Sequence, residues 1–244
     1  MRSLKVISAL LGYPENELFE ARQALIDEVQ SDEGLPEAQQ AQLIEFIEQL
    51  CNQELMDAQE NYVSLFDRGR SLSLLLFEHV HGESRDRGQA MVDLMAVYEK
   101  EGFAIDVREL PDYLPLFLEY LSLRPESEVQ QWLADVSHIL ALLETRLHQR
   151  KCNYALLFEV LLSFTGVPVE RKELREKVAA EVRDDTPEAM DEVWEEEMVR
   201  FTENSAQDCG DNAISQRRRE LDKVQPLNIQ PLSPSAPSES AGSF

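Results

Sequence analysis

The cluster that most resembles a metal site lies between residues 78 and 86, where His79 and His81 stand among carboxylates. On a helix, two residues that are two positions apart point about 200° away from each other, so these histidines could not bind one ion. On a strand they could, but no third ligand follows at a spacing that is typical of zinc. We therefore predict no metal and no cofactor. The plainer alternative is that one histidine hydrogen-bonds within a loop and the other is exposed.

Two turns rich in arginine and aspartate flank this cluster. The first is Asp67-Arg68-Gly69-Arg70 and the second is Arg85-Asp86-Arg87-Gly88. Neither is a phosphate-binding loop, because both lack the required glycine spacing and the Lys-Ser/Thr pair. Arginine pairs readily with carboxylates, so the two turns could clasp each other as a structural network. The functional alternative is that they line a groove that holds a polypeptide.

An apolar segment, Leu72–Val80, runs between the two turns. A buried helix is its leading interpretation. The alternative is that Leu75, Phe77 and their neighbours form the apolar floor of a peptide groove with an acidic rim.

The segment Pro111-Asp112-Tyr113 precedes another apolar helix. Asp112 is expected to be the N-cap of that helix, with Pro115 as its third residue and Phe117 on its buried face. Tyr113 offers a ring and one hydroxyl group but no charge near neutral pH. Glu119 could meet a basic peptide side chain, although a solvated glutamate is the commoner outcome.

The composition limits the partners that the protein can have. The chain has 244 residues, of which 43% are hydrophobic, and its formal net charge is −24. Such acidity repels nucleic-acid phosphates and anionic lipid, and it suits a basic peptide, although solubility alone would also explain it. Three widely spaced cysteines indicate thiols in a reducing cytoplasm. No apolar run is long enough to span a membrane, and the N-terminus lacks the features of a signal peptide.

Apolar residues recur at helical spacing along most of the chain, and no convincing alternating run predicts a strand. Asn16 is expected to cap a helix that reaches Val29, and Leu55–Phe66 is expected to form another. Ser127 and Gln130 form a capping box for a long predicted helix that ends near residue 147. We predict an all-α protein with one compact helical domain over residues 1–183, an acidic peripheral helix over 184–204 and a disordered tail over 205–244.

Residues 62–121 carry a family resemblance, which is traceable from Leu4 to about Phe201. The pattern resembles the NarJ-type chaperones, which mature the molybdenum-containing subunit of respiratory nitrate reductase and belong to the all-helical group that includes TorD and DmsD. In that wider group a Pro-x-Asp-His signature is implicated in binding the leader peptide. Here no residue separates Pro111 from Asp112, and Tyr113 stands where histidine is usual.

The resemblance implies a cytoplasmic chaperone without catalytic activity. Its partner would be the N-terminal segment of the apo catalytic (α) subunit of a nitrate reductase, which it would keep from docking prematurely on the membrane while molybdenum cofactor is inserted. The chaperone would be a monomer or a weak dimer. The candidate peptide-binding residues are Tyr62, Asp67, Arg70, Leu75, Phe77, His79, Glu83, Asp86, Asp112, Tyr113, Phe117 and Glu119.

Two alternatives come from other functional classes. The first is a small enzyme or carrier that itself holds molybdopterin or a metal, which analysis of bound metal and chromophore would reveal. The second is an acidic module that binds several basic partners, which selectivity for one leader over scrambled peptides would exclude.

Overall fold

The computed structural model describes residues 2–82, 84–105, 109–168, 170–189 and 191. Helices follow the apolar periodicity from the start, because Leu4, Ile7 and Leu10 share one face and are fully buried. The N-terminal helices are α1 (Arg2–Leu11), α2 (Asn16–Glu20), α3 (Arg22–Gln30), α4 (Glu37–Cys51) and α5 (Leu55–Phe66).

The helices after residue 75 complete the all-α fold, and this prediction is confirmed. They are α6 (Leu76–His81), α7 (Asp86–Lys100), α8 (Leu114–Ser122), α9 (Glu126–Asp135), α10 (Ser137–Gln149), α11 (Ala155–Thr165) and α12 (Arg171–Ala179). Among the described residues the β-structure consists of one isolated antiparallel bridge, between Leu75 and Tyr113.

Two predicted helices need correction. The helix expected from Asn16 to Val29 is interrupted at Ala21, and Asn16 is its first residue rather than its cap. The long helix after Ser127 is divided at Val136, and its N-cap is Pro125, so the capping box does not form. In both helices the apolar stripe continues across the turn. The spacing of apolar residues therefore does not reveal where the helix is interrupted.

The segment Leu72–Val80 is also only partly helical. α6 begins at Leu76, while Leu72 and Leu74 are buried in the non-helical segment that precedes it. Val80 is exposed. The run of apolar residues therefore reflects a buried non-helical segment followed by a short helix, rather than one buried helix.

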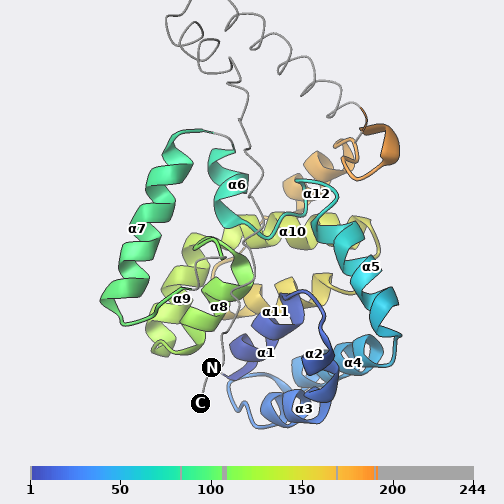
Figure 1. Ribbon diagram of the computed structural model, residues 1–244, viewed down its shortest axis with the longest axis vertical. Helices are drawn as coiled ribbons and strands as arrows, with labels where there is room; N and C mark the ends of the chain where they lie inside the picture. Colours follow the sequence, from blue (N-terminus) through green and yellow to red (C-terminus); the bar gives the residue numbers. More distant parts are fainter. Residues whose placement is uncertain (1, 83, 106–108, 169, 190, 192–244) are drawn as a thin grey trace, which may run out of the picture. The chain divides into compact units, whose positions relative to one another are not determined.

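The core is centred on α11, which is apolar almost all the way round. Its residues Leu157, Phe158 and Leu161 are fully buried. α11 packs against α10, α9 and α4, and α1 packs against α8 and α3. Figure 1 shows α6 and α7 beside each other, away from α3 and α4. None of the described helices is both long and apolar enough to cross a membrane.

The segment after α12 is tied to the loop between α5 and α6. Asp184 accepts hydrogen bonds from the backbone N–H and the hydroxyl of Ser71, at 2.7 and 2.6 Å. Arg150 on the α10–α11 connection pairs with Asp184 at 3.3 Å and with Asp185 at 3.0 Å. The compact unit extends to Asp191. Residues 192–204 of the predicted acidic helix and the predicted disordered tail lie outside the described residues.

Candidate functional site

Three segments that are distant in sequence meet where the candidate residues were predicted. The backbone before α6 pairs with the backbone before α8 through the bridge between Leu75 and Tyr113. Leu76 donates its N–H to the Asp112 carbonyl at 2.9 Å, and Leu114 donates to the Leu74 carbonyl at 2.8 Å. The pairing holds Tyr113 beside the apolar segment.

Asp112 caps a different helix from the one that the sequence predicted. The N-cap of α8 is Tyr113, whereas the Asp112 carboxylate accepts the N–H of Phe77, in the first turn of α6, at 3.1 Å. Arg87 on α7 lies 3.9 Å from the same carboxylate oxygen. Asp112 is fully buried, and burial raises the pKa of its carboxyl although Phe77 and Arg87 act in the opposite direction. In this conformation Asp112 joins α6, α7 and α8 and has no exposed surface for a ligand.

Tyr62 on α5 connects the paired segments to the N-terminal helices. Its hydroxyl donates to the Leu11 carbonyl at 2.9 Å and lies 3.2 Å from the Tyr113 hydroxyl. Its ring meets Tyr13 edge-on, with the ring centroids 5.6 Å apart. Tyr62 is buried, whereas Tyr13 is 45% exposed and Tyr113 is half-buried, so the accessible surface of this aromatic cluster comes from the latter two.

The negative charges of two carboxylates act on the half-buried Tyr113 hydroxyl. Burial raises the pKa of Tyr113, and the negative charges of Glu109 and Asp67 raise it further, while its hydrogen bond to Tyr62 acts in the opposite direction. Asp67 follows the last residue of α5 and is exposed, and partial burial raises the pKa of its carboxyl. We call Tyr13, Tyr62, Asp67, Glu109 and Tyr113 the tyrosine–carboxylate cluster. It presents aromatic faces, hydroxyl groups and negative charge, which together suit a cationic side chain.

His79 and His81 have separate environments. His79 Nε2 lies 2.8 Å from the Ser73 carbonyl, and burial lowers the pKa of His79. His81 is half-buried, with its ring 5.9 Å from that of Phe77. His79 therefore bonds from α6 back to the loop before that helix, and His81 packs on an aromatic ring instead of being exposed as the plainer alternative held.

The turns rich in arginine and aspartate have ionic partners elsewhere in the fold. Arg70 lies 4.0 Å from Glu78 on α6, and Arg87 faces Asp112. Asp86 is exposed at the start of α7. These pairs tie the first turn to α6 and the second turn to the segment before α8.

The remaining candidates differ in accessibility. Phe117 is buried and packs edge-on against Trp132, with the ring centroids 6.0 Å apart. Glu119 is exposed on α8, and Leu75 and Phe77 are half-buried. Glu83 lies outside the described residues. A peptide could therefore reach Asp67, Arg70, Glu119 and parts of Leu75, Phe77 and Tyr113, while Phe117 supports α8 from the inside.

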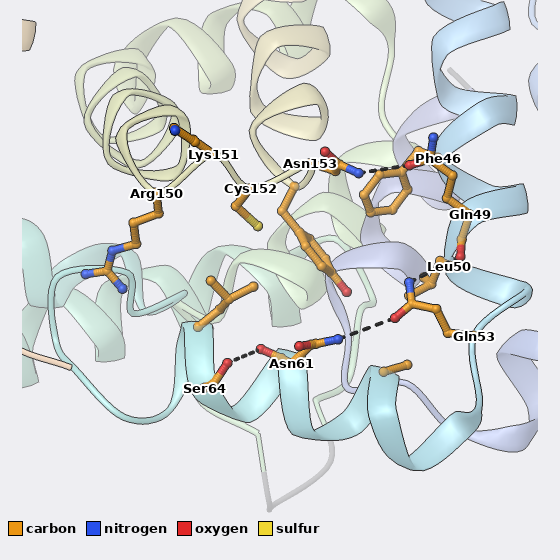
Figure 2. A pocket seen from close by; sticks show the side chains of 13 residues that line it. Phe46, Gln49, Leu50, Gln53, Asn61, Ser64, Arg150, Lys151, Cys152 and Asn153 are labelled. Carbon is orange, nitrogen blue, oxygen red and sulfur yellow. Dashed lines mark hydrogen bonds between the residues drawn. The ribbon is translucent and has the colours of Figure 1, made fainter. Parts of the chain in front are cut away.

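A cavity that the sequence did not predict lies between α4, α5 and the α10–α11 connection (Figure 2). Its volume is about 350 Å³. Asn153 donates to Gln49 at 2.8 Å, and Asn61 donates to Gln53 at 3.4 Å. Lys151 on its wall has a left-handed backbone, with φ of 53°. The remaining lining residues are Phe46, Leu50, Ala58, Ser64, Leu65, Arg150, Cys152 and Tyr154.

Among the amide residues of this cavity, Gln49 lies on α4, whereas Gln53 follows the end of that helix. Nothing in the sequence places Asn61 and Asn153 opposite them, because they reach the cavity from α5 and from the α10–α11 connection.

Known proteins share most of this chain. It is 48% identical to the nitrate reductase molybdenum cofactor assembly chaperone NarJ of Escherichia coli K12. That alignment spans 219 residues and covers 90% of this chain and 92% of that protein. The same coverage applies to the probable assembly chaperone NarW of that organism, at 46% identity. The probable NarJ of Bacillus subtilis 168 is 31% identical over 169 residues, or 66% of this chain and 86% of that protein.

The family resemblance predicted from residues 62–121 is confirmed by these alignments. A separate match to the nitrate reductase delta subunit family covers residues 31–159, which is more than half of the chain and includes α4 to α10 and most of the tyrosine–carboxylate cluster. The chain belongs to the nitrate reductase delta subunit family.

Proposed function

We propose that this protein is a non-catalytic chaperone that binds the N-terminal segment of the apo catalytic subunit of a nitrate reductase. In this role it delays membrane docking of that subunit until molybdenum cofactor has been inserted. The identity of 48% to a protein named as a nitrate reductase molybdenum cofactor assembly chaperone carries the proposal. The free thiols of Cys51 and Cys152 suit the reducing cytoplasm, where such a client is folded.

The tyrosine–carboxylate cluster is the proposed contact for a basic residue of the client segment. The supporting observation is that Asp67 and Glu109 both act electrostatically on the half-buried Tyr113 hydroxyl. A guanidinium or ammonium group placed there would pair with a carboxylate and lie against the ring of Tyr13. The half-buried Leu75 and Phe77 would then receive apolar residues of an amphipathic segment.

The test is a calorimetric titration with a synthetic peptide of the catalytic subunit's N-terminal segment. Asp67→Asn should weaken binding by about 1 to 2 kcal/mol, roughly five- to thirty-fold in Kd, because a charge-assisted hydrogen bond is lost. Asp57→Asn is the matched control, since Asp57 is exposed in the first turn of α5, the helix that Asp67 follows, and its removal changes the net charge equally.

The two variants separate local recognition from long-range attraction. Equal, small losses for Asp67→Asn and Asp57→Asn would contradict the cluster as the contact. A scrambled peptide of equal charge that bound as tightly as the true sequence would instead support an acidic module with several basic partners.

The alternative of an enzyme or cofactor carrier is tested separately. It requires turnover of a substrate, or a stoichiometric organic chromophore, in the isolated protein. Either result would overturn the chaperone proposal, whereas binding of the N-terminal peptide with neither of them would support it.

A further inference from the structure

Glu144, His148 and Glu159 bring three potential metal-ligand atoms together on a part of the fold remote in sequence from His79 and His81. Glu144 and His148 are four residues apart on α10, so they share one helix face. Glu159 comes from α11, which packs along α10. The three ligand atoms all lie within 4.8 Å of one another.

One of the two printed distances in this cluster matches a coordination sphere, and the other is shorter. His148 Nε2 lies 3.4 Å from Glu144 Oε1. Two ligand atoms around a tetrahedral zinc ion, with bonds of about 2.1 Å, are separated by about 3.4 Å. His148 Nε2 lies 2.5 Å from Glu159 Oε1, so a bound ion would require these two atoms to part by about 1 Å. Both side chains can move, because His148 is 50% exposed and Glu159 is 35% exposed.

Glu144 provides a second, independent observation. Its side chain is 2% exposed, and its Oε1 atom accepts no hydrogen bond from the described residues. The nitrogen atoms nearest to Oε1 in its ion pairs are those of His148, at 3.4 Å, and Arg171, at 3.6 Å. A buried carboxylate oxygen without a hydrogen bond is costly unless something else satisfies it. This oxygen faces the other two ligand atoms.

We propose that Glu144, His148 and Glu159 bind a divalent first-row transition metal of the zinc class. One imidazole nitrogen with two carboxylate oxygens is a donor set that suits zinc and its neighbours, while magnesium and calcium prefer oxygen alone. The two carboxylates outweigh the single charge of Arg171, which is 45% exposed and could turn toward solvent. The half-exposed position of His148 leaves room for water ligands.

A metal at this site would join α10 to α11, the central helix of the core. The proposal does not depend on the client-binding function, because the three ligands lie outside the tyrosine–carboxylate cluster. A simpler arrangement competes with it, in which a protonated His148 bridges the two glutamates and no metal binds. The experiment must therefore separate an ion from a proton at His148 Nε2.

The test is a titration of the full chain with zinc chloride, read by competition with a chromogenic zinc indicator and by metal analysis after desalting. His148→Gln should lower the zinc affinity by about tenfold or more and remove one bound equivalent. His138→Gln is the matched control, because His138 is exposed on the same helix. It should leave both values unchanged. Magnesium at millimolar concentration should not displace the zinc.

A second variant guards against a loss of fold. Glu144→Gln keeps the shape of the buried side chain and removes its charge, so the helical circular dichroism should be retained while zinc affinity falls. Zinc should also raise the thermal unfolding temperature of the wild type but not of these two ligand variants. If His148→Gln and His138→Gln bound zinc with equal stoichiometry and affinity, the site would be refuted. No zinc binding by the wild-type protein would leave the proton-bridged arrangement in its place.

Discussion

At the scale of single residues, Asp112 differs most from what its sequence neighbours suggest. It precedes α8 by two positions, yet its carboxylate satisfies an N–H group of α6 and faces Arg87 of α7. Its other oxygen, Oδ1, accepts no hydrogen bond from the described residues. Asp112 therefore positions the segment that carries Tyr113 and Phe77. A direct contact of Asp112 with the client remains a prediction, and this conformation does not favour it.

The unfolding free energy of the Asp112→Asn variant should increase relative to that of the wild type as pH rises. Burial makes the pKa of Asp112 higher in the folded protein than the value of about 3.9 in an unfolded chain. The folded state therefore binds the proton more tightly, and wild-type stability falls as pH rises from about 3.9 through the folded pKa. Asparagine does not titrate and still accepts the Phe77 N–H. Urea unfolding of both proteins between about pH 3.5 and 7 measures the difference.

The direction of this difference is the test. A difference in unfolding free energy that stays flat over the pH range, or that turns against the variant, would contradict the raised pKa. Asp112→Ala provides the reference for the hydrogen bond. It removes the acceptor and should cost about 1 to 2 kcal/mol.

At the scale of secondary-structure elements, the helices around the candidate site are held by contacts with residues distant in sequence rather than by intrinsic helix stability. α6 has six residues, too few for a helix that is stable alone. Its first turn is held by Asp112, and the loop that precedes it is tied by Ser71 to Asp184. Arg146 adds a hydrogen bond from α10 to the Ser71 carbonyl at 2.7 Å. The acidic residues after α12 thus stabilise the loop that leads to the candidate site.

Gly69→Ala should destabilise this loop. A Cβ atom at position 69 would lie 2.7 Å from the carboxylate carbon of Asp184, closer than real contacts allow, so the hydrogen bonds to Ser71 would have to shift. We expect a loss of about 1 to 3 kcal/mol of unfolding free energy, as for other overpacked sites. Urea unfolding at neutral pH measures it.

Gly88→Ala is the control for this change. Gly88 lies within α7, and a Cβ there would meet nothing within 4 Å. Alanine should be neutral, or should stabilise by about 0.4 to 1 kcal/mol, because it narrows the unfolded ensemble. Equal unfolding free energies of Gly69→Ala and Gly88→Ala would show that the Asp184 side chain moves aside without loss of stability.

At the scale of the whole molecule, the net charge of −24 is the dominant property. Its effect on a basic client is long-ranged and depends on ionic strength, because the Debye length falls from about 14 Å at 50 mM to about 4 to 5 Å at 500 mM salt. The apolar part of the contact does not share this dependence. In the proposed binding mode, charge governs how the client is attracted, while the half-buried apolar residues hold it.

Raising the salt from 50 to 500 mM should weaken binding of the N-terminal peptide on the order of tenfold, with a residual affinity that persists at high salt. Binding should also show a negative heat-capacity change from apolar burial. Calorimetry at several temperatures and salt concentrations measures both. A peptide with its basic residues replaced by glutamine should show much less salt dependence. Affinity that does not change with salt would contradict the electrostatic part.

The sequence by itself determined the helical class, the family and the acidic character of the surface. These follow from local periodicity, from motifs and from composition, and each can be read without knowing which segments meet. The bounds of α5 were predictable for the same reason. The breaks at Ala21 and Val136 were not, because the apolar stripe continues on both sides of each turn.

Only the tertiary structure decided which residues act together. Asp112 caps α6 because long-range pairing with Leu76 brings that helix to it, although local spacing made it a cap for α8. Tyr62 and Tyr113 share a hydrogen bond across 51 residues, and Glu159 reaches His148 from the next helix. Such contacts depend on how helices pack in three dimensions, and periodicity identifies the face of a helix that is buried but not the partner that buries it.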